Sequence, residues 1–227
     1  MDFGNLDIIS SREFYDICNN QNHKIIKFGK VNQPKVYEKD GHTIIKLFYP
    51  KQRLLSSDRI KPRAMRFYNN VKSLHTHGYD VPQVNKVQFC PELKMYVIYY
   101  HKIQGDDVRT LAKQGNLNII YNVAHLLADL HKNGIFFRSI HLENLLSKPD
   151  GNIALLDLTD VTFKSRALTI YRRYRNIKHL FQEPNDRELW QAFGVKNFLD
   201  AYFKSAKLPK ISQTLLAIFI KRSIKAN

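Results

Sequence analysis

The spacing of hydrophobic residues changes its period about a hundred residues into the chain. Up to that point, short segments alternate apolar with polar residues, the pattern of half-buried strands, and turn formers separate them. Beyond Gly105 the period becomes helical, and apolar residues fall on one face at Ile119, Ile120, Val123, Leu126, Leu127 and Leu130. Because strands come first and helices second, the sequence predicts an α+β fold.

These segments are expected to form two lobes. Residues 1–103 are predicted to be an antiparallel sheet with one helix at 62–77, its strands lying at 23–31, 35–40, 42–50, 84–90 and 93–103. Residues 104–227 are predicted to be mainly helical, with a hairpin around the turn Pro149-Asp150-Gly151 and basic helices from about residue 172. Because no repeat or long linker interrupts the chain, we expect one domain with a hinge at 99–105.

The composition indicates a folded protein with a strongly basic surface. Hydrophobic residues make up 44% of the chain, and Lys and Arg outnumber Asp and Glu by 36 to 20, a net charge of +16. Such a charge attracts nucleic acid, anionic lipid or phosphorylated glycolipid, and also suits a merely solvated surface. Cys18 and Cys90 lie far apart without metal-ligand spacing, and no apolar run approaches the ~18 residues that span a bilayer. We therefore expect a cytoplasmic protein, or one bound at a membrane surface.

The residues that could carry chemistry lie between the long helical stripe and the basic helices. Asn144 follows Ser139 by five positions, and Asp157 follows Asn144 by thirteen, at the end of the apolar segment IALL. Carboxylate and amide oxygens are ligands that magnesium prefers. Lys46, in the strand segment TIIKLF, is a cation that could reach phosphate groups. Taken singly, Asp157 could simply end a strand and Lys46 could point to water.

The spacing of these residues resembles the protein kinase signature, in which H-R-D-x-x-x-x-N precedes D-F-G. Phe137, Arg138 and Ser139 occupy the H-R-D positions, and Asp157 opens D-L-T in place of D-F-G. More narrowly, residues 130–160 and the basic segment 171–180 resemble the lipopolysaccharide core kinases, including the Kdo and heptose kinases and the toluene tolerance proteins. The resemblance covers about residues 25–180.

This resemblance implies a two-lobed kinase-like fold that uses ATP and Mg²⁺ to phosphorylate a sugar of the lipopolysaccharide inner core. The reaction would take place on the cytoplasmic face of the inner membrane, and no specific nucleic acid partner is expected. It implies metal ligation by Asn144 and Asp157 and nucleotide binding by Lys46, Tyr99, Tyr100 and His101. It further implies catalytic roles for Ser139, His141 and Asp160 and substrate binding by Arg138, Arg172, Arg173 and Arg175.

The chain departs from the kinase pattern at three places. Ser139 replaces the aspartate that accepts the substrate proton, and the predicted helix at 62–77 contains no glutamate, with Phe67 or Asn70 near its expected place. The turn at 32–34 carries no glycine-rich motif. These departures leave open a pseudokinase that binds nucleotide or anionic glycolipid without turnover. A nucleic-acid-binding protein also stays open, on charge alone. The C-terminal segment, apolar on one helical side, is expected to pack on the lobe or to seat on an anionic membrane.

Overall fold

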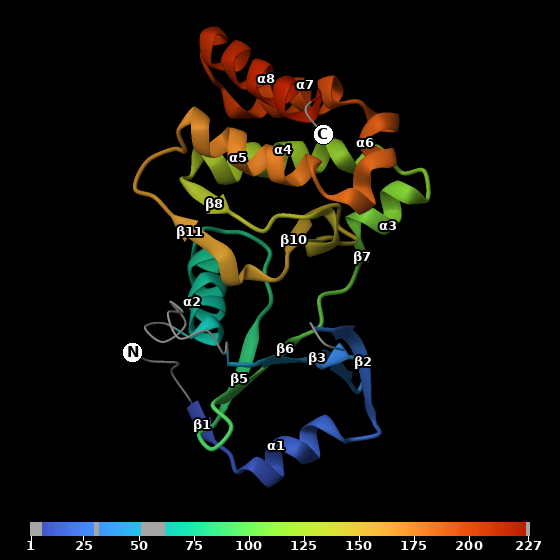
Figure 1. Ribbon diagram of the computed structural model, residues 1–227, viewed down its shortest axis with the longest axis vertical. Helices are drawn as coiled ribbons and strands as arrows, with labels where there is room; N and C mark the ends of the chain where they lie inside the picture. Colours follow the sequence, from blue (N-terminus) through green and yellow to red (C-terminus); the bar gives the residue numbers. More distant parts are fainter. Residues whose placement is uncertain (1–5, 30–31, 51–61, 226–227) are drawn as a thin grey trace. The chain divides into compact units, whose positions relative to one another are not determined.

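The computed structural model describes residues 6–29, 32–50 and 62–225, with only the backbone described at 224–225. The chain divides into two compact units, Met1–Ile103 and Gln104–Asn227. A sheet dominates the first unit and helices dominate the second (Figure 1). The α+β class predicted from the sequence is therefore confirmed.

The first unit is built on a six-stranded sheet with the order β1-β5-β6-β4-β3-β2. The predicted antiparallel sheet needs a correction, because β1 pairs in parallel with β5 and makes the sheet mixed. Strand β2 ends at Phe28, and Lys30 and Val31 of the predicted strand lie outside the described residues. The strands are β1 (Leu6–Ile8), β2 (His23–Phe28), β3 (Pro34–Lys39), β4 (Thr43–Phe48), β5 (Val84–Cys90) and β6 (Met95–His101).

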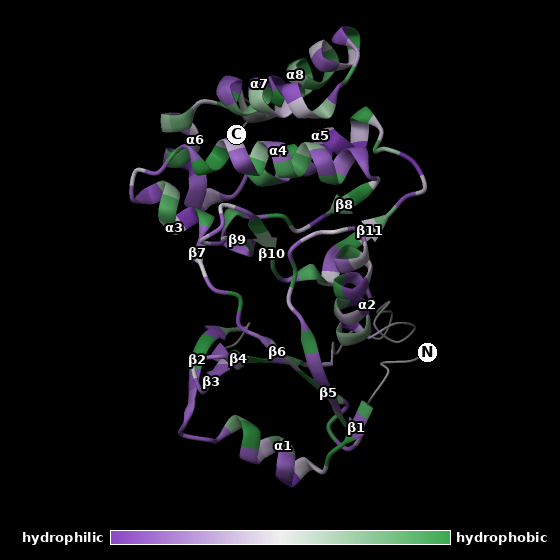
Figure 2. Ribbon diagram, turned by 180° about the vertical axis from the view of Figure 1, so that it is seen from behind, coloured by the Kyte–Doolittle hydropathy of each residue, from purple (hydrophilic) through white to green (hydrophobic). Residues whose placement is uncertain are grey.

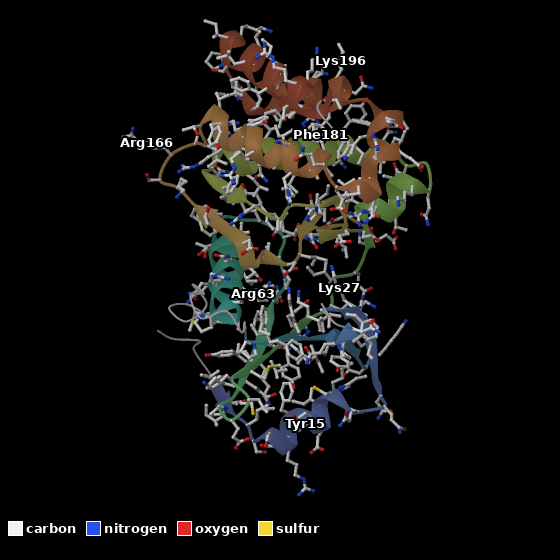
Figure 3. The ribbon with its side chains drawn as sticks, viewed as in Figure 1. Tyr15, Lys27, Arg63, Arg166, Phe181 and Lys196 are labelled. Carbon is white, nitrogen blue, oxygen red and sulfur yellow. The ribbon has the colours of Figure 1, made fainter. Side chains whose placement is uncertain are left out.

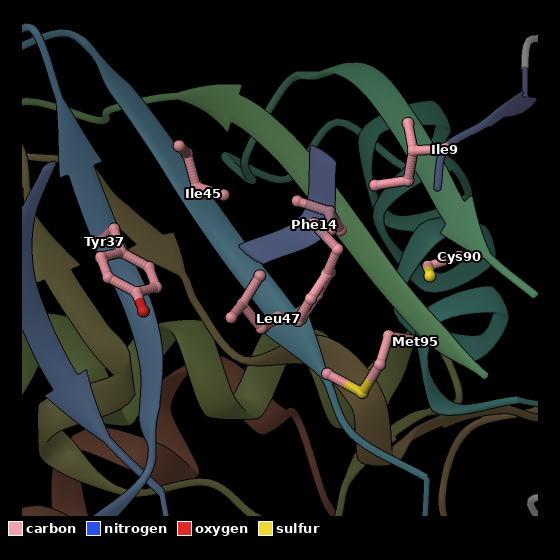
Figure 4. Packing of buried hydrophobic residues seen from close by; sticks show 8 residues of the cluster. Ile9, Phe14, Tyr37, Ile45, Leu47, Cys90 and Met95 are labelled. Carbon is pink, nitrogen blue, oxygen red and sulfur yellow. The ribbon is translucent and has the colours of Figure 1, made fainter. Parts of the chain in front are cut away.

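Each face of this sheet packs against a helix. Helix α1 (Ser11–Cys18) starts with a capping box, in which Ser10 accepts the backbone N–H of Glu13 and the Glu13 carboxylate accepts that of Ser10. Its Phe14 packs into an apolar cluster on the sheet (Figure 4), whose buried members are Ile9, Phe14, Tyr37, Ile45, Leu47, Cys90, Met95 and Val97. Helix α2 (Arg63–Thr76), predicted from the sequence, covers the alternate face through Phe67, which contacts Phe48 and Tyr100.

The second unit is organised around α4 (Ile119–Lys132). Its predicted stripe is buried, except that Leu126 is only partly so. Helix α4 packs on α7, and α5 packs on α8. The side chain of Phe181, at the end of α5, lies within this unit, and Lys196 lies at its surface (Figure 3). The other helices are α3 (Val108–Lys113), α5 (Ile170–Phe181), α6 (Arg187–Phe193), α7 (Val195–Ala206) and α8 (Lys210–Lys225).

Short antiparallel ladders complete the second unit. Strand β8 (Ile135–Phe137) pairs with β11 (Val161–Phe163), and β9 (Leu145–Ser147) pairs with β10 (Ile153–Leu155) and β7 (Asp106–Asp107). The turn at 149–151 joins β9 to β10, so the predicted hairpin is confirmed. None of the helices in the described part of the chain is long and apolar enough to cross a bilayer.

Candidate functional site

Two backbone hydrogen bonds hold the loop at 138–144 beside the segment at 156–160. The N–H of Arg138 donates to the carbonyl of Asp160 at 3.1 Å, and the N–H of Leu156 donates to the carbonyl of Asn144 at 2.8 Å. The β8–β11 and β9–β10 ladders flank these bonds. The predicted ligands Asn144 and Asp157 therefore belong to adjacent backbone segments of one unit.

Asn144 is buried and its amide has a fixed orientation. It ends the 3₁₀ helix η3 (Leu142–Asn144), and its Nδ2 donates to the carbonyl of Ser139 at 3.2 Å. Because the amino group is committed to that bond, Oδ1 is directed the other way. A neutral oxygen held rigidly in this manner is a suitable ligand for a hard cation.

Asp157 has a left-handed backbone, with φ 51° and ψ 51°, where β10 passes into the 3₁₀ helix η4 (Leu158–Asp160). This conformation costs a non-glycine residue roughly 1 kcal/mol and is common at functional sites. Two positions on, Thr159 is buried, and its hydroxyl has no hydrogen-bond partner in the part of the chain that the structure describes. Asp160 is exposed. The segment thus combines a left-handed backbone at Asp157 with a buried hydroxyl at Thr159 that lacks a hydrogen-bond partner among the described residues.

The metal-binding capacity of this segment is limited. No group of three or more His, Cys, Asp or Glu side chains among the described residues could hold a metal ion. One carboxylate and one amide nevertheless suit Mg²⁺, which usually takes one or two protein ligands and completes its shell with phosphate oxygens and water. The residues present therefore fit an ion shared with a nucleotide.

A partly buried ion-pair cluster that the sequence did not reveal lies against the loop. The guanidinium of Arg109, on α3, pairs with Asp186, whose side chain is fully buried, and with Glu143 at 2.7 Å. Its Nη2 atom also lies 3.8 Å from Oε1 of Glu183. Burial raises the pKa of Asp186, and the charge of Arg109 opposes that shift. Because 77 positions separate Arg109 from Asp186, no local spacing could have indicated the pair.

His141 lies at the edge of this cluster. Its Nδ1 is 3.1 Å from Oε2 of Glu183, close enough for an ion pair but outside hydrogen-bond alignment. Its ring is 4.6 Å from the ring of His179 on α5. Burial lowers the pKa of His179, His141 and Arg138 lower it further, and Glu183 opposes them. The predicted catalytic residue His141 is thus positioned by two side chains that sequence analysis missed.

The arginines predicted to bind substrate lie in different surroundings. Arg138 and Arg175 are exposed and Arg172 is half-buried. Arg173 is only 2% exposed, and its guanidinium donates to the carbonyl of Leu168 and to the hydroxyl of Tyr202, both at 2.8 Å. The prediction for Arg173 is therefore corrected, because its donors serve the protein interior.

Arg173 belongs to a buried polar network that ends at the loop. The hydroxyl of Tyr202 accepts from Arg173 and donates to Nδ1 of His131, while Nε2 of His131 donates to Oδ1 of Asn176 at 3.0 Å. The amide of Asn176 then donates to the carbonyl of Phe137 at 2.7 Å, one residue before the loop. Burial lowers the pKa of His131 to about 3, so this imidazole is neutral. The network ties three helices to the start of the loop.

In the first unit, Lys46 is buried on the face of the sheet that α2 covers. It pairs with Val36 on β3 and Ile98 on β6, and it is 4% exposed. Its Nζ lies 4.6 Å from the ring centroid of Phe67 and 5.5 Å from that of Phe48. The Lys46 amine therefore makes a cation–π contact with α2, whose sequence contains no Asp or Glu. Phosphate binding by Lys46 stays a prediction.

The residues predicted to bind adenine are the last three of β6, the strand that pairs with the strand of Lys46. Tyr99 is half-buried, and burial raises its pKa to about 12. Tyr100 is buried and contacts Phe67, whereas the side chain of His101 is exposed. The backbone N–H of His101 donates to the carbonyl of Gln83 at 3.2 Å. Nucleotide binding by these residues stays a prediction.

A cavity of about 650 Å³ opens beside the ion-pair cluster in the second unit. Phe181 and Trp190 form its apolar wall, and Glu183 and Arg187 supply charge. Glu183 therefore lines the cavity while it contacts His141. No sequence pattern indicated this cavity, because its lining comes from the end of α5, from α6 and from the turn between them.

No protein-family model matches the chain, and no curated protein sequence matches it. Among solved structures, two of the bifunctional kinase-methyltransferase WbdD are similar at 15% identity, with TM-scores of 0.45 and 0.46. They cover 88% and 82% of this chain, which spans about half the length of the WbdD chains (53% and 44%).

A third similar structure is a divergent kinase that lacks the glycine-rich loop and regulates membrane ultrastructure of the Toxoplasma parasitophorous vacuole. It is 16% identical, with a TM-score of 0.39, and the match covers 82% of this chain and 61% of that one. Similarity at this level carries no information on activity. The function proposed below is therefore based on the residues of this chain.

Proposed function

We propose that the protein is an ATP-dependent phosphotransferase of the protein-kinase-like type, which transfers phosphate to an alcohol group. The proposal depends on one observation, that two backbone hydrogen bonds hold the segments at 138–144 and 156–160 side by side. These adjacent segments carry an oriented amide, Asn144, and a carboxylate, Asp157, whose backbone is left-handed. This proposal treats the two compact units as the lobes of one kinase-like domain.

Asn144 and Asp157 would hold magnesium, and Lys46 would contact the α and β phosphates of ATP. When bound, magnesium neutralises phosphate charge and so supplies most of the electrostatic stabilisation that phosphoryl transfer requires. Tyr99, Tyr100 and His101 would bind adenine through their backbone. The cation–π contact with Phe67 supports this proposal, because it gives the Lys46 amine a defined place on the face of the sheet that α2 covers.

The acceptor hydroxyl would lie near His141 and Asp160. Ser139 is a poor base at neutral pH, and its carbonyl already orients Asn144. His141, held beside Glu183, is the proposed contact to the acceptor, and the exposed Asp160 is the alternative proton acceptor. A weak base is tolerable here, because positioning and charge neutralisation dominate phosphoryl transfer.

The proposed acceptor is a sugar of the lipopolysaccharide inner core, phosphorylated at the cytoplasmic face of the inner membrane. The resemblance of residues 130–180 to lipopolysaccharide core kinases supports this choice, as does the net charge of +16. Arg138, Arg172 and Arg175, which reach the surface at least in part, are the candidate contacts for the anionic glycolipid.

Transfer of labelled γ-phosphate from ATP to purified core oligosaccharide tests the proposal. Wild-type protein should label the acceptor, and Asp157→Ala should abolish labelling. Asp200→Ala is a matched control, because Asp200 is an exposed carboxylate on α7. If wild type and Asp157→Ala are equally inert, phosphotransferase activity should be abandoned.

A pseudokinase is the second candidate, and Ser139 at the position of the catalytic aspartate favours it. Such a protein would bind nucleotide or anionic glycolipid without turnover. A rise in melting temperature with ATP and magnesium, together with no measurable transfer, would support the pseudokinase. Measurable turnover would exclude it.

A further inference from the structure

Helix α8 has two apolar stripes, of which only one is buried. Leu216 and Ile220 are fully buried and attach the helix to the rest of its unit. A second stripe is exposed to solvent, at Ile211 (76%), Leu215 (43%), Ile218 (38%) and Phe219 (40%). These four positions share one side of the helix. The hydropathy colouring of α8 shows this mixture of hydrophobic and hydrophilic residues (Figure 2).

Helix α5, which packs on α8, extends the exposed stripe with aromatic rings. The ring of Tyr174 lies 5.8 Å from that of Phe219 and 6.5 Å from that of Tyr171. Tyr171 is 64% exposed. We call this surface the α5–α8 face, and it consists of Tyr171, Tyr174, Ile211, Leu215, Ile218 and Phe219.

The helices that form the α5–α8 face carry positive and no negative side chains. The sequences of α5 and α8 contain no Asp or Glu. Two of the cations contact the tyrosine rings, with Arg175 6.0 Å from the centroid of Tyr171 and Lys178 5.9 Å from that of Tyr174. The basic residues of the two helices that reach the surface are Arg172, Arg175, Lys178, Lys210, Lys221 and Arg222.

We propose that the α5–α8 face seats the protein on the surface of a bilayer that contains anionic phospholipid. Exposed apolar side chains would enter the boundary between headgroups and acyl chains, tyrosines would lie at headgroup level, and Lys and Arg would attract the lipid charge. A second copy of the chain is a poorer occupant, because two such faces would bring like charges together. A nucleic acid would leave the apolar stripe uncovered. This inference does not depend on phosphotransferase activity.

Vesicle co-sedimentation of the full chain tests the apolar part of the inference. The protein should pellet with vesicles of phosphatidylcholine and phosphatidylglycerol, and not with phosphatidylcholine alone. Replacing Ile211 and Leu215 with Ser should weaken the partition about tenfold without lowering the melting temperature, since both side chains are exposed. Ile8→Ser is the control, because Ile8 is 64% exposed on β1 of the other unit and should leave the partition unchanged.

Charge reversal tests the electrostatic part. The double variant Lys221→Glu with Arg222→Glu should weaken the partition about tenfold or more. Lys72→Glu with Lys94→Glu makes the same change in net charge at exposed positions elsewhere and should have a much smaller effect. The inference would be overturned if both double variants lost the same amount of binding, or if the Ser replacements of Ile211 and Leu215 left binding unchanged. It would also be overturned by a stable dimer in sedimentation equilibrium that Ile211→Ser disrupts.

Discussion

Lowering the pH from 7 to 5 is expected to remove about 2 kcal/mol of stability from the helical unit through His131 alone. The imidazole is fully buried on α4, and burial lowers its pKa to about 3, because desolvation and the nearby Arg173 disfavour the charged ring. In the unfolded chain the pKa returns to its ordinary value of 6.5. Between these two values the unfolded state binds a proton that the folded state does not.

The sign of the effect follows from that difference. Above pH 6.5 both states are neutral and His131 makes no pH-dependent contribution. As the pH falls through 6.5, the unfolded state gains a proton and the free energy of unfolding drops by about 1.4 kcal/mol per unit. The loss levels off only near pH 3, where the folded state is protonated as well.

Urea unfolding of wild type and His131→Gln at pH 7 and pH 5 measures this contribution. The variant should be less stable at pH 7, because Tyr202 loses its hydrogen-bond acceptor. Its loss of stability between pH 7 and 5 should be about 2 kcal/mol smaller than that of wild type. His125→Gln, at an exposed position of the same helix, should keep the wild-type pH dependence. An unchanged pH dependence in His131→Gln would refute the assignment.

Two further predictions concern the stability of the second unit. Gly134→Ala should cost ~2 kcal/mol or more in urea unfolding, because φ is +74° and a Cβ would lie 2.4 Å from the carbonyl oxygen of Lys164. Gly151→Ala, with φ +83° and open space around it, should cost only about 1 kcal/mol, and equal costs would contradict the packing argument. Arg109→Met should cost roughly 3–5 kcal/mol by leaving Asp186 buried and unpaired. The double variant with Asp186→Leu should be more stable than Arg109→Met, and a less stable double variant would contradict that explanation.

Local pattern was enough to predict most of the regular elements. The segment TIIKLF, predicted to be a strand, forms β4, and the stripe from Ile119 to Leu130 forms α4 with nearly all of its apolar residues buried. The turn at 149–151 marked the β9–β10 hairpin. In each segment the propensity, the period and the turn residues agree, and sequence analysis works best under that condition.

Elements that depend on distant contacts escaped prediction. Strand β1 has three residues and exists because it pairs in parallel with β5, about eighty positions away. Helix α1 was missed for a different reason, because its local signal, the capping box between Ser10 and Glu13, was not recognised in the sequence. The parallel pairing turned the predicted antiparallel sheet into a mixed one.

The surroundings of the candidate site were equally hidden. The spacing of Asn144 and Asp157 indicated two adjacent ligands, but Arg109, Asp186 and Glu183 meet only in the folded unit. Arg173 looked like its neighbours in the basic run at 171–178, yet the helix turns it into the interior toward Tyr202. A run of like charges does not reveal which member is buried, because burial depends on what packs against the helix.

We propose that the chain binds nucleotide and magnesium, with Lys46, Asn144 and Asp157 as the residues that contact them. Titration of the full chain with a fluorescent ATP analogue, with magnesium or with EDTA, tests it most directly. We expect saturable binding that requires magnesium and weakens about tenfold or more in both Lys46→Met and Asp157→Asn. Binding that is absent in wild type, or that both variants retain at full strength, would contradict it.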